Sequence, residues 1–370
     1  MNPEGYILQL QKEGARGAAD RTVLALLSAL SVLYGKGAES RLRKESARAA
    51  DPGLPAVSIG NITAGGTGKT PVAMWLAGFL SCRGLRPAVL SRGYRGSAEK
   101  RGAVVSDFSR IYLSAEQAGD EPYLMARSLP GVPVLTGKDR CRSAEKAKAM
   151  GADILLLDDG FQYWRMKRDL DLVLIDSTWP FGGGHLLPRG LLREPLDHLS
   201  RAGLFILTKA DQAGEQAKTD IRRVLTEKAP GVPVIEAWHR PAECLSFEEW
   251  QRGTRTAGAS LTHVKGMKAL AMSGVGNPDG FLRTAADAGL ETVGQMAFPD
   301  HHAYTEDDLD RAEEAAVRQG AECIVITEKD GVKLPPRASQ TGVPVYVLSI
   351  RVVFEEKGQY LLEKKLEEIL

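Results

Sequence analysis

Cysteine is scarce in this chain, and so is any excess of charge. The 370 residues include four cysteines, Cys82, Cys141, Cys244 and Cys323, which lie far apart and form no C-x-x-C pair. This spacing argues against a zinc site or a disulfide framework and favours a reducing cytosol. The 48 Lys and Arg residues nearly balance the 47 Asp and Glu residues. Nucleic-acid binders normally carry a basic excess, so we expect no nucleic-acid partner, and no protein partner is evident either.

The apolar stretch near the N-terminus is too short to span a bilayer. It runs from Val23 to Tyr34, whereas a spanning helix needs about 20 apolar residues. On a helical wheel, one face carries Val23, Leu26, Leu27, Leu30, Leu33 and Tyr34. With its basic flanks, this pattern predicts an interfacial membrane helix within residues 1–45. The alternatives are a helix packed on protein and a secretory signal, although no A-x-A-like cleavage site follows.

Downstream, short apolar runs alternate with helical patterns. We expect strands at 55–60, 86–91, 131–136, 152–158, 170–176 and 203–208. A helix is expected from Thr70 to Ser81, after the first of them. Such alternation is typical of a mostly parallel sheet that is covered by helices on both faces. The sequence therefore predicts an α/β fold whose active site lies at the carboxyl ends of the strands.

A second, smaller α/β pattern follows the first. Its expected strands are 268–274, 322–327 and 343–350, and its expected helices are 278–288 and 306–319. A polar stretch rich in Gly and Thr separates the two patterns and is typical of a linker. We therefore divide the chain into the N-terminal helix with its basic flank (1–45), a first α/β domain (46–240), a linker (241–265) and a C-terminal α/β domain (266–370).

The strongest motif is a glycine-rich loop between the first expected strand and helix. SIGNITAGGTGKTP (58–71) departs from G-x-x-x-x-G-K-T at Thr63, and the added Gly65–Gly66 pair supplies the flexibility instead. Backbone N–H groups of such a P-loop bind phosphate oxygens. Lys69 would reach the β- and γ-phosphates of ATP, and the Thr70 hydroxyl would bind Mg²⁺. The expected nucleotide-binding residues are Thr63, Ala64, Gly65, Gly66, Thr67, Gly68, Lys69 and Thr70.

Two carboxylates follow another of the expected strands. The run ILLLDD ends in Asp158 and Asp159. A Walker-B element needs an acid at a strand end close to Mg²⁺, and this run provides one. Together with the P-loop, it predicts a P-loop NTPase-type domain that hydrolyses a nucleoside triphosphate or transfers its γ-phosphate.

Transfer to a hydroxyl also needs a group that takes the hydroxyl proton. The candidate carboxylates are Asp120 in AGDEP and Glu194 in PRGLLREP. The candidate imidazoles are His301 and His302 in FPDHHAY, either of which could instead be a satisfied surface residue. These residues alone do not decide which of them takes the proton.

Eight segments in the same order resemble the tetraacyldisaccharide 4'-kinase family, the kinases of the lipid A pathway. They are GNITAGGTGKTP (60–71), SRGYRG (91–96), GDEP (119–122), DDGFQ (158–162), PRGLLREP (188–195), GVGNP (274–278), FPDHHAY (298–304) and TEKDGVKL (327–334). Each segment is short, but eight in family order are specific. Family members also begin with a short hydrophobic helix that docks on the inner membrane, which matches residues 23–34.

The resemblance implies a role for each matching residue. Asp120 and His301 look like the catalytic dyad, in which Asp120 takes the proton of the sugar hydroxyl and His301 orients it. Arg193 would steady the transferring phosphoryl group together with Lys69. The positions that match residues near Mg²⁺ and the phosphates, and that we expect with Thr70 as metal ligands, are Asp158, Asp159, Gln162 and Glu194.

The resemblance also implies the donor, the acceptor and the location. ATP with Mg²⁺ would phosphorylate the 4'-hydroxyl of a tetraacylated glucosamine disaccharide 1-phosphate, giving lipid IVA. Since such a lipid stays in the bilayer, we expect a peripheral protein at the cytoplasmic face of the bacterial inner membrane.

Two other functions share parts of this pattern. The loop is similar to that of GTPases and ATPases of the partitioning and metallochaperone type, and LTKAD (207–211) contains T-K-x-D, similar to a guanine-specifying motif. Strict GTP hydrolysis without a lipid acceptor would favour such a switch. The other alternative is a non-catalytic membrane adaptor, although the intact Lys69, Thr70 and Asp158 argue against it.

Overall fold

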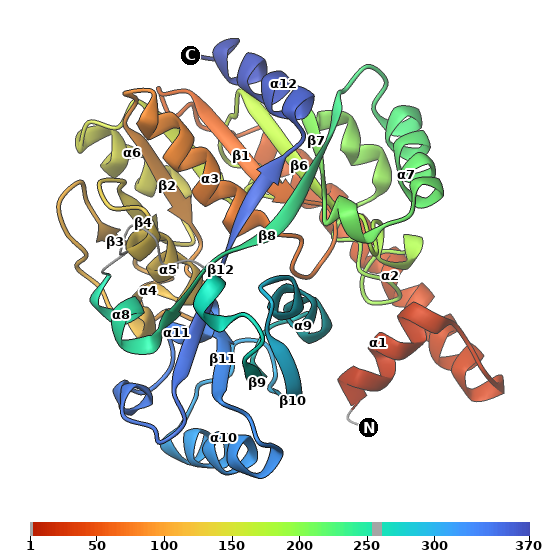
Figure 1. Cartoon of the computed structure of the whole chain (residues 1–370). Coiled ribbons are helices and arrows are strands. Elements are labelled where there is room, and N and C mark those ends of the chain that lie inside the picture. Colours follow the sequence, from red (N-terminus) through yellow and green to blue (C-terminus); the bar gives the residue numbers. More distant parts are fainter. Residues whose placement is uncertain (1–2, 254–260) are drawn as a thin grey trace.

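The computed structural model describes residues 3–253 and 261–370, and the described strands form one sheet (Figure 1). From edge to edge they are β10 (Glu291–Ala297), β9 (Lys268–Ser273), β11 (Cys323–Thr327), β12 (Val345–Phe354), β8 (Val234–Ser246), β7 (Leu204–Thr208), β6 (Leu170–Asp176), β1 (Ala56–Asn61), β5 (Ile154–Asp158), β2 (Pro87–Ser91), β4 (Val134–Thr136) and β3 (Ala103–Ser106). Only the β12–β8 and β3–β4 pairs within these residues are antiparallel. The predicted mostly parallel sheet is confirmed.

The first half of the sheet is buried on both faces. Its helices are α3 (Lys69–Cys82), α4 (Ala115–Ala118), α5 (Asp120–Ser128), α6 (Arg140–Ala149) and α7 (Glu215–Lys228). α3 and α5 pack on one face and α6 and α7 on the other. On α3, Leu76 and Leu80 are fully buried against the strands, and each such side chain contributes about 1.5–3 kcal/mol. This packing fixes the start of α3 at the end of β1.

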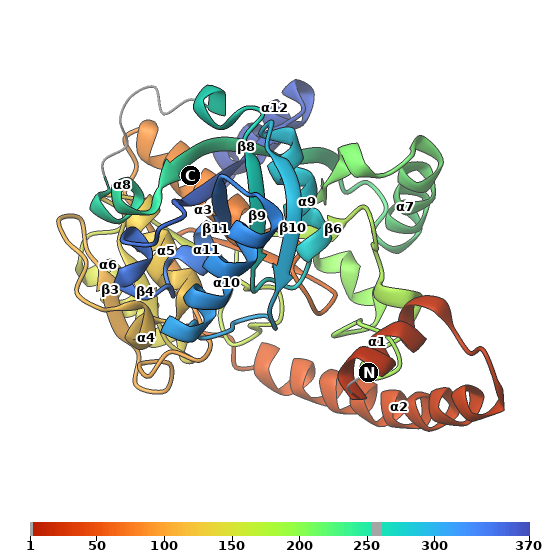
Figure 2. The same ribbon diagram turned by 60° about the horizontal axis from the view of Figure 1, so that its bottom comes forward.

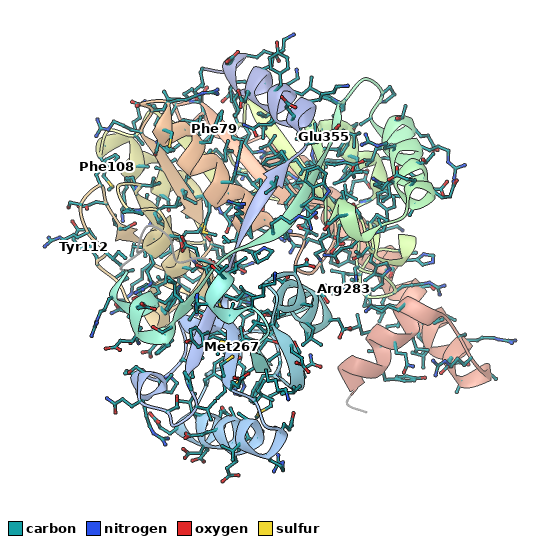
Figure 3. The ribbon with its side chains drawn as sticks, viewed as in Figure 1. Phe79, Phe108, Tyr112, Met267, Arg283 and Glu355 are labelled. Carbon is teal, nitrogen blue, oxygen red and sulfur yellow. The ribbon has the colours of Figure 1, made fainter. Side chains whose placement is uncertain are left out.

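The second half carries its own core around β9, β11 and β12. Its helices are α8 (Phe247–Arg252), α9 (Pro278–Asp287), α10 (Glu306–Gln319) and α11 (Glu328–Gly331). Leu309 of α10 packs in one apolar cluster with these strands, and Phe281 of α9 packs in a second cluster. In Figure 3, Arg283 of α9 is labelled where this half approaches the first, and its guanidinium lies 3.4 Å from Gln212 Oε1.

Two long strands join the halves. β8 pairs with β7 of the first half and, over most of its length, with β12. After β12, the helix α12 (Glu356–Glu367) returns to the first core, where Leu362 and Leu366 are buried. Arg83 of the first half pairs with Glu363 of this helix at 2.8 Å.

Two expected boundaries differ in detail from the structure. The stretch 241–265, expected as a linker, begins with the end of β8 and continues into α8, while residues 254–260 lie outside the described residues. The expected C-terminal domain, 266–370, ends in α12, which packs on the first half. The spacing of its apolar residues shows that α12 is amphipathic, but it does not predict which of the two hydrophobic cores its apolar side packs against.

Helices α1 (Pro3–Glu13) and α2 (Ala18–Ser46) form an arm at the edge of the molecule (Figure 2). The helix that contains the apolar run 23–34 is therefore much longer than that run. Among the described residues of α2, the buried ones are Leu24, Ser31 and Ala38, which lie on one line along the helix.

Candidate active site

The glycine-rich loop joins β1 to α3, as the sequence predicts. Gly65 and Gly68 have φ angles of 110° and 85°, left-handed values that favour glycine because it has no Cβ. α3 begins at Lys69, so its free N–H groups face the loop. The Lys69 ammonium donates to Asn61 Oδ1 at 3.1 Å and lies 3.5 Å from Asp159 Oδ1. The loop thus presents N–H groups and one held cation, as phosphate binding requires.

Asp159 lies beside this loop because β5 pairs in parallel with β1. Its φ of 52° is unusual for a residue with a side chain. Arg193 donates to both carboxylate oxygens of Asp159, at 2.8 and 3.0 Å. Burial by itself raises the pKa of Asp159, but the cations Lys69 and Arg193 outweigh it and hold that pKa well below its usual range. Asp159 is therefore ionised and fixes both cations.

The carboxylate of Asp158 accepts no hydrogen bond from a cation within the described residues. It is 2% exposed, and its Oδ2 accepts from Ser91 Oγ at 3.3 Å. Its Oδ1 has no hydrogen-bond partner in the same part of the chain. Burial, reinforced by the nearby carboxylates of Glu121 and Asp159, raises the pKa of Asp158 to about 7. Ionising Asp158 at neutral pH is therefore costly unless a further cation approaches it.

Gln162 and Glu194 are hydrogen-bonded to each other and to this cluster. Gln162 Nε2 donates to Glu194 Oε1 and to the Asn61 carbonyl, both at 2.8 Å. Gln162 Oε1 accepts from Arg193 at 3.1 Å. Glu194 is fully buried and ion-paired, and neither residue lines the cavity described below. Their contacts fix Asn61 and Arg193, which in turn hold Lys69 and Asp159.

Asp120 and His301 come together across the two halves. Asp120 begins α5, whereas His301 lies between β10 and α10, and its Nδ1 is 3.1 Å from Asp120 Oδ2. Tyr94 packs edge-on against the imidazole, with 5.6 Å between ring centroids. Burial by itself raises the pKa of Asp120, but the hydrogen bond with His301 and the charge of Lys333 lower it overall. The pair therefore offers an ionised carboxylate held by an imidazole.

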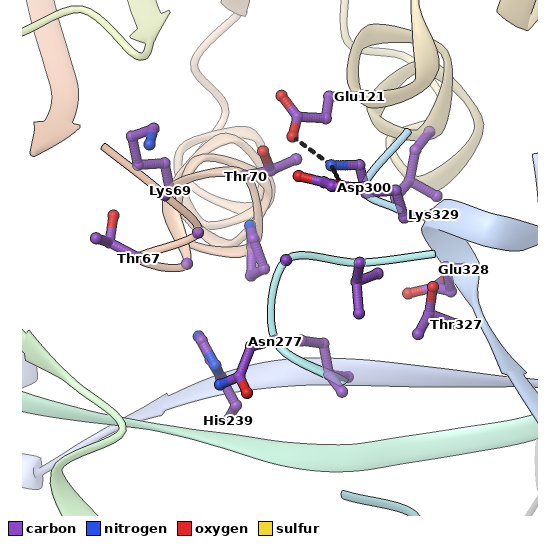
Figure 4. A pocket seen from close by; sticks show the side chains of 18 of the residues that line it. Thr67, Lys69, Thr70, Glu121, His239, Asn277, Asp300, Thr327, Glu328 and Lys329 are labelled. Carbon is purple, nitrogen blue, oxygen red and sulfur yellow. Dashed lines mark hydrogen bonds and ion pairs between the residues drawn. The ribbon is translucent and has the colours of Figure 1, made fainter. Parts of the chain in front are cut away.

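A cavity of about 560 Å³ opens beside these groups (Figure 4). Residues 65–70 of the P-loop form part of its wall, and Asn277 and Lys329 come from the second half. Lys329 Nζ donates to Glu121 Oε1 at 3.3 Å and to Asp300 Oδ1 at 3.2 Å, which ties the halves together. The volume lies within the roughly 300–1,000 Å³ that is typical of small-molecule sites.

Backbone strain is concentrated at this cavity. Among the described residues, the non-glycine residues with positive φ are Arg95, Asp159, Lys209 and His301. Three of them line the cavity, and the fourth, Arg95, lies 3.5 Å from the His301 carbonyl. Such conformations cost about 1–3 kcal/mol each and cluster at functional sites. The strain supports the cavity as the candidate active site without reference to any motif.

Comparisons with known proteins give the same assignment. The model of the tetraacyldisaccharide-1-P 4'-kinase family, LpxK, matches residues 23–367. The chain belongs to this family. A tetraacyldisaccharide 4'-kinase of Anaeromyxobacter sp. (strain Fw109-5) is 47% identical over 285 residues, 77% of this chain and 74% of that protein. One from Syntrophus aciditrophicus (strain SB) is 41% identical over 347 residues, 90% of each chain.

A solved structure of the same family is similar over nearly the whole chain. It is the "apo" form of LpxK from Aquifex aeolicus in complex with ATP, with 27% identity and a TM-score of 0.71. The match covers 94% of this chain and 99% of that chain. The family resemblance inferred from the eight segments is confirmed.

Most of the residues expected to bind nucleotide in this LpxK-family chain line the cavity, but two do not. Gly65 to Thr70 line it. The two that do not line it pair with the backbone of a later segment: Ala64 N–H donates to the Leu191 carbonyl at 2.7 Å, and Thr63 forms an isolated β-bridge with Leu192. Asp120 is not a lining residue either, although its side chain remains 18% exposed. Within the described ranges, no group of three or more His, Cys, Asp or Glu side chains is arranged to hold a metal ion.

Three residues at or beside the site are not predicted from the sequence: Lys329, Lys333 and His239. Lys329 and Lys333 lie in the TEKDGVKL segment, and their position just after β11 is the signal that could have found them. His239 of β8 faces the P-loop (Figure 4), so close that a Cβ on Gly68 would lie 2.6 Å from its imidazole. Burial lowers the pKa of His239 to about 4. Nothing in its local sequence distinguishes it from an ordinary strand residue.

The arm of this LpxK-family chain presents an apolar row on α2. Leu26, Leu30 and Leu33 are 64%, 51% and 66% exposed, and they belong to the face expected from the helical wheel. On another side of the helix, Ser31 Oγ donates to the Leu186 carbonyl at 2.8 Å. α2 therefore packs on the protein through its serine side and leaves this leucine row uncovered. The apolar run 23–34 alone is too short to span a bilayer, but α2 as a whole has 29 residues, and by length and composition alone it is long and apolar enough to cross a membrane.

Proposed function

We propose that this chain is an ATP-dependent kinase that phosphorylates the 4'-hydroxyl of a tetraacyl glucosamine disaccharide 1-phosphate, giving lipid IVA. The observation that carries the proposal is that the P-loop and His301 line one cavity, with Asp120 held directly behind by the imidazole of His301. Transfer to a hydroxyl requires a phosphate-binding loop beside a proton acceptor. Family membership, and relatives named tetraacyldisaccharide 4'-kinase, support the acceptor. The name of the Aquifex aeolicus LpxK complex supports ATP as the donor.

Lys69 and Arg193 are proposed to neutralise the phosphate charge during transfer. Both line the cavity, and both are held by the ionised Asp159. As the bond from the γ-phosphorus to the bridging oxygen breaks, the electron pair moves onto the leaving ADP. Cations fixed in advance stabilise this charge without reorganisation.

The oxygen atoms beside the loop fit a bound Mg²⁺. Thr70, Asp158 and Asp159 line the cavity, and the unpartnered Oδ1 of Asp158 is suited to a cation. Gln162 and Glu194, also expected as ligands, do not line the cavity, and their oxygen atoms are bonded to Arg193 and Arg201, so we do not propose them as ligands. Mg²⁺ is usually held by one or two carboxylates together with phosphate oxygens. When bound, it neutralises charge on the β- and γ-phosphates.

Asp120 is proposed to accept the proton of the acceptor hydroxyl. The O–H bond breaks, the proton passes to the carboxylate, and the sugar oxygen bonds to the γ-phosphorus. His301, whose Nδ1 is 3.1 Å from Asp120 Oδ2, orients the carboxylate for this step. The lowered pKa of Asp120 keeps the carboxylate ionised before the reaction.

The exposed row on α2 is proposed to lie in the cytoplasmic surface of the inner membrane. Leu26, Leu30 and Leu33 would enter the lipid, so that an acceptor with four acyl chains need not leave the bilayer. At the edge of the same face, Tyr34 connects the helix to the active site instead, since its hydroxyl donates to the Arg193 carbonyl at 3.1 Å. The helix proposed to bind the membrane is therefore bonded directly to Arg193, which is proposed to bind phosphate.

The guanine-dependent switch is less well supported by the site. Asp211 of the T-K-x-D sequence is ion-paired with Arg240 at 2.8 Å, and Lys209 is ion-paired with Asp176. An aspartate that reads guanine needs its carboxylate for the base. Its engagement with Arg240 therefore favours a donor other than GTP.

Product analysis tests the proposed function. The protein is incubated with ATP, Mg²⁺ and the detergent-dispersed acceptor, and the lipid is analysed by mass spectrometry and NMR. We expect the addition of one phosphate at the 4' position. The matched control is the same lipid already phosphorylated at that position, which should gain nothing. Phosphorylation of both lipids, or strict GTP hydrolysis with neither lipid modified, would refute the proposal.

A further inference from the structure

A buried lysine lies behind the catalytic pair and has no part in the mechanism described so far. Lys333 follows α11 in the second half, and its side chain is 8% exposed. Its Nζ lies 3.6 Å from Asp120 Oδ2 and 3.6 Å from Asp330 Oδ1. Within the described residues this ammonium has no hydrogen-bond partner, and it lies 5.5 Å from the centroid of the Tyr304 ring. Burying an ammonium without a hydrogen bond costs free energy unless nearby carboxylates compensate its charge.

Asp330 alone does not account for the position of Lys333. The carboxylate of Asp330 is fully buried and already accepts from the Gly274 N–H at 3.0 Å and the Tyr304 hydroxyl at 2.9 Å. It also accepts from the Thr327 hydroxyl at 2.7 Å. With these bonds in place, Asp330 needs no ammonium for hydrogen bonding. Lys333 is instead held between two carboxylates, one of which belongs to the other half of the molecule.

We propose that Lys333 is a positioning residue for Asp120, whose charge keeps that carboxylate ionised and directed at His301 when the two halves meet. This inference rests on the proposed role of Asp120 as proton acceptor. At 3.6 Å the ammonium attracts the carboxylate without occupying it as a hydrogen-bond donor. Asp120 therefore keeps an oxygen free to take the proton of the acceptor.

The other charged groups around Asp120 do not replace Lys333. His301 contacts the same carboxylate oxygen from the loop before α10. The charge of Lys329 also lowers the pKa of Asp120, but this lysine donates to Glu121 and to Asp300. Lys333 makes a larger contribution than Lys329 to the lowered pKa of Asp120. Without Lys333, the main group left to lower the pKa of Asp120 against the effect of burial would be the imidazole of His301.

Substitutions that remove the charge test this role. Lys333→Met and Lys333→Gln keep much of the chain length, and Lys333→Arg keeps the charge. We expect the acidic limb of the pH profile of kcat/KM to move to higher pH by about one pH unit in the Met and Gln variants, because an opposite charge within about 4–6 Å shifts a pKa by 1–3. The Arg variant should restore the wild-type profile. The control Lys357→Met removes an equal charge from the exposed part of α12 and should leave the profile unchanged.

A titration that does not depend on turnover separates this inference from the proposed function. The ¹³Cγ signal of Asp120, assigned with Asp120→Asn, is followed against pH in the wild type and in each variant. A titration midpoint that rises in the Met or Gln variant supports the inference, even if the wild type transfers no phosphate to the lipid and the proposed function fails. An unchanged midpoint and an unchanged pH profile in a folded Met or Gln variant would overturn it, even if the wild type makes the phosphorylated lipid.

Discussion

Replacing Asp158 with asparagine should stabilise the folded protein while abolishing transfer. Asp158 ends β5 with a buried carboxylate, one oxygen of which has no hydrogen-bond partner within the described residues. Burial and the neighbouring carboxylates Glu121 and Asp159 raise its pKa to about 7. The folded state therefore holds a proton that the unfolded chain releases at lower pH. The amide of the Asp158→Asn variant would keep the shape of the side chain, and because it is neutral it avoids the cost of a buried negative charge.

The size of the effect follows from the two pKa values of Asp158. Its ordinary pKa is 3.8 and its folded pKa is about 7. Between these values the unfolded state releases its proton first, so the free energy of unfolding of the wild type falls by about 1.4 kcal/mol per pH unit. Above pH 7 the accumulated loss is about 4 kcal/mol. The loss is small near pH 4, where both states are largely protonated at this position.

Urea denaturation of the wild type and Asp158→Asn at pH 5 and pH 8 measures this effect. The stability advantage of the variant should be about 2–3 kcal/mol larger at pH 8 than at pH 5. The control Asp287→Asn removes an exposed carboxylate of α9 and should show no such difference between the two pH values. Saturating Mg²⁺ and ATP should reduce the advantage by stabilising the wild type. An advantage that is equal at both pH values would refute the argument.

The remaining predictions concern charge, membrane attachment and the catalytic pair. Lys69→Ala should lower kcat by about 10²–10³-fold, and a tenfold or smaller loss in the transfer assay would show that Lys69 does not act at the γ-phosphate. Replacing Leu30 and Leu33 together with glutamine should reduce co-sedimentation with anionic liposomes without weakening ATP binding; unchanged sedimentation would count against the interfacial helix. Asp120→Asn and His301→Ala should be strongly non-additive, because the two act as one unit. Additive losses of kcat/KM in the double variant would contradict that coupling.

The central strands could be predicted because burial on both faces leaves a strong signal. The run 170–176 coincides with β6, and the other five apolar runs of the first α/β pattern overlap β1, β2, β4, β5 and β7. Edge strands carry a weaker signal. β10 is mostly exposed or half-buried and its sequence, ETVGQMA, shows no continuous apolar run, so no strand is expected there. The edge strand β3 is also absent from the predictions, because its four residues, AVVS, are too few to show a periodic pattern.

The candidate site divides in the same way. Lys69, Thr70 and Asp158 stand in local motifs, so their chemistry follows from short stretches of sequence. Asp120 and His301 are 181 residues apart, and nothing local shows that they meet at 3.1 Å; only the family resemblance pairs them. His302 contacts Asp308 in the capping box of α10, which agrees with its interpretation as a satisfied surface residue.

Residues that act through long-range contacts could not be predicted. Lys333 lies within a family segment that gives it no role, since its partner Asp120 lies in the other half. His239 gives no signal because its importance arises from the pairing of β8 with its neighbours beside the P-loop. The return of α12 to the first core is a further consequence of the β8–β12 pairing.

The most direct test of the account is transfer of labelled γ-phosphate from ATP to a detergent-dispersed tetraacyl disaccharide 1-phosphate, with the wild type beside Asp120→Ala. The account predicts a labelled lipid with the wild type and a nearly complete loss of label with the variant. Labelled lipid formed equally by both proteins would remove Asp120 from the mechanism. No labelled lipid with either, while ATP or GTP is still hydrolysed, would contradict the kinase assignment itself.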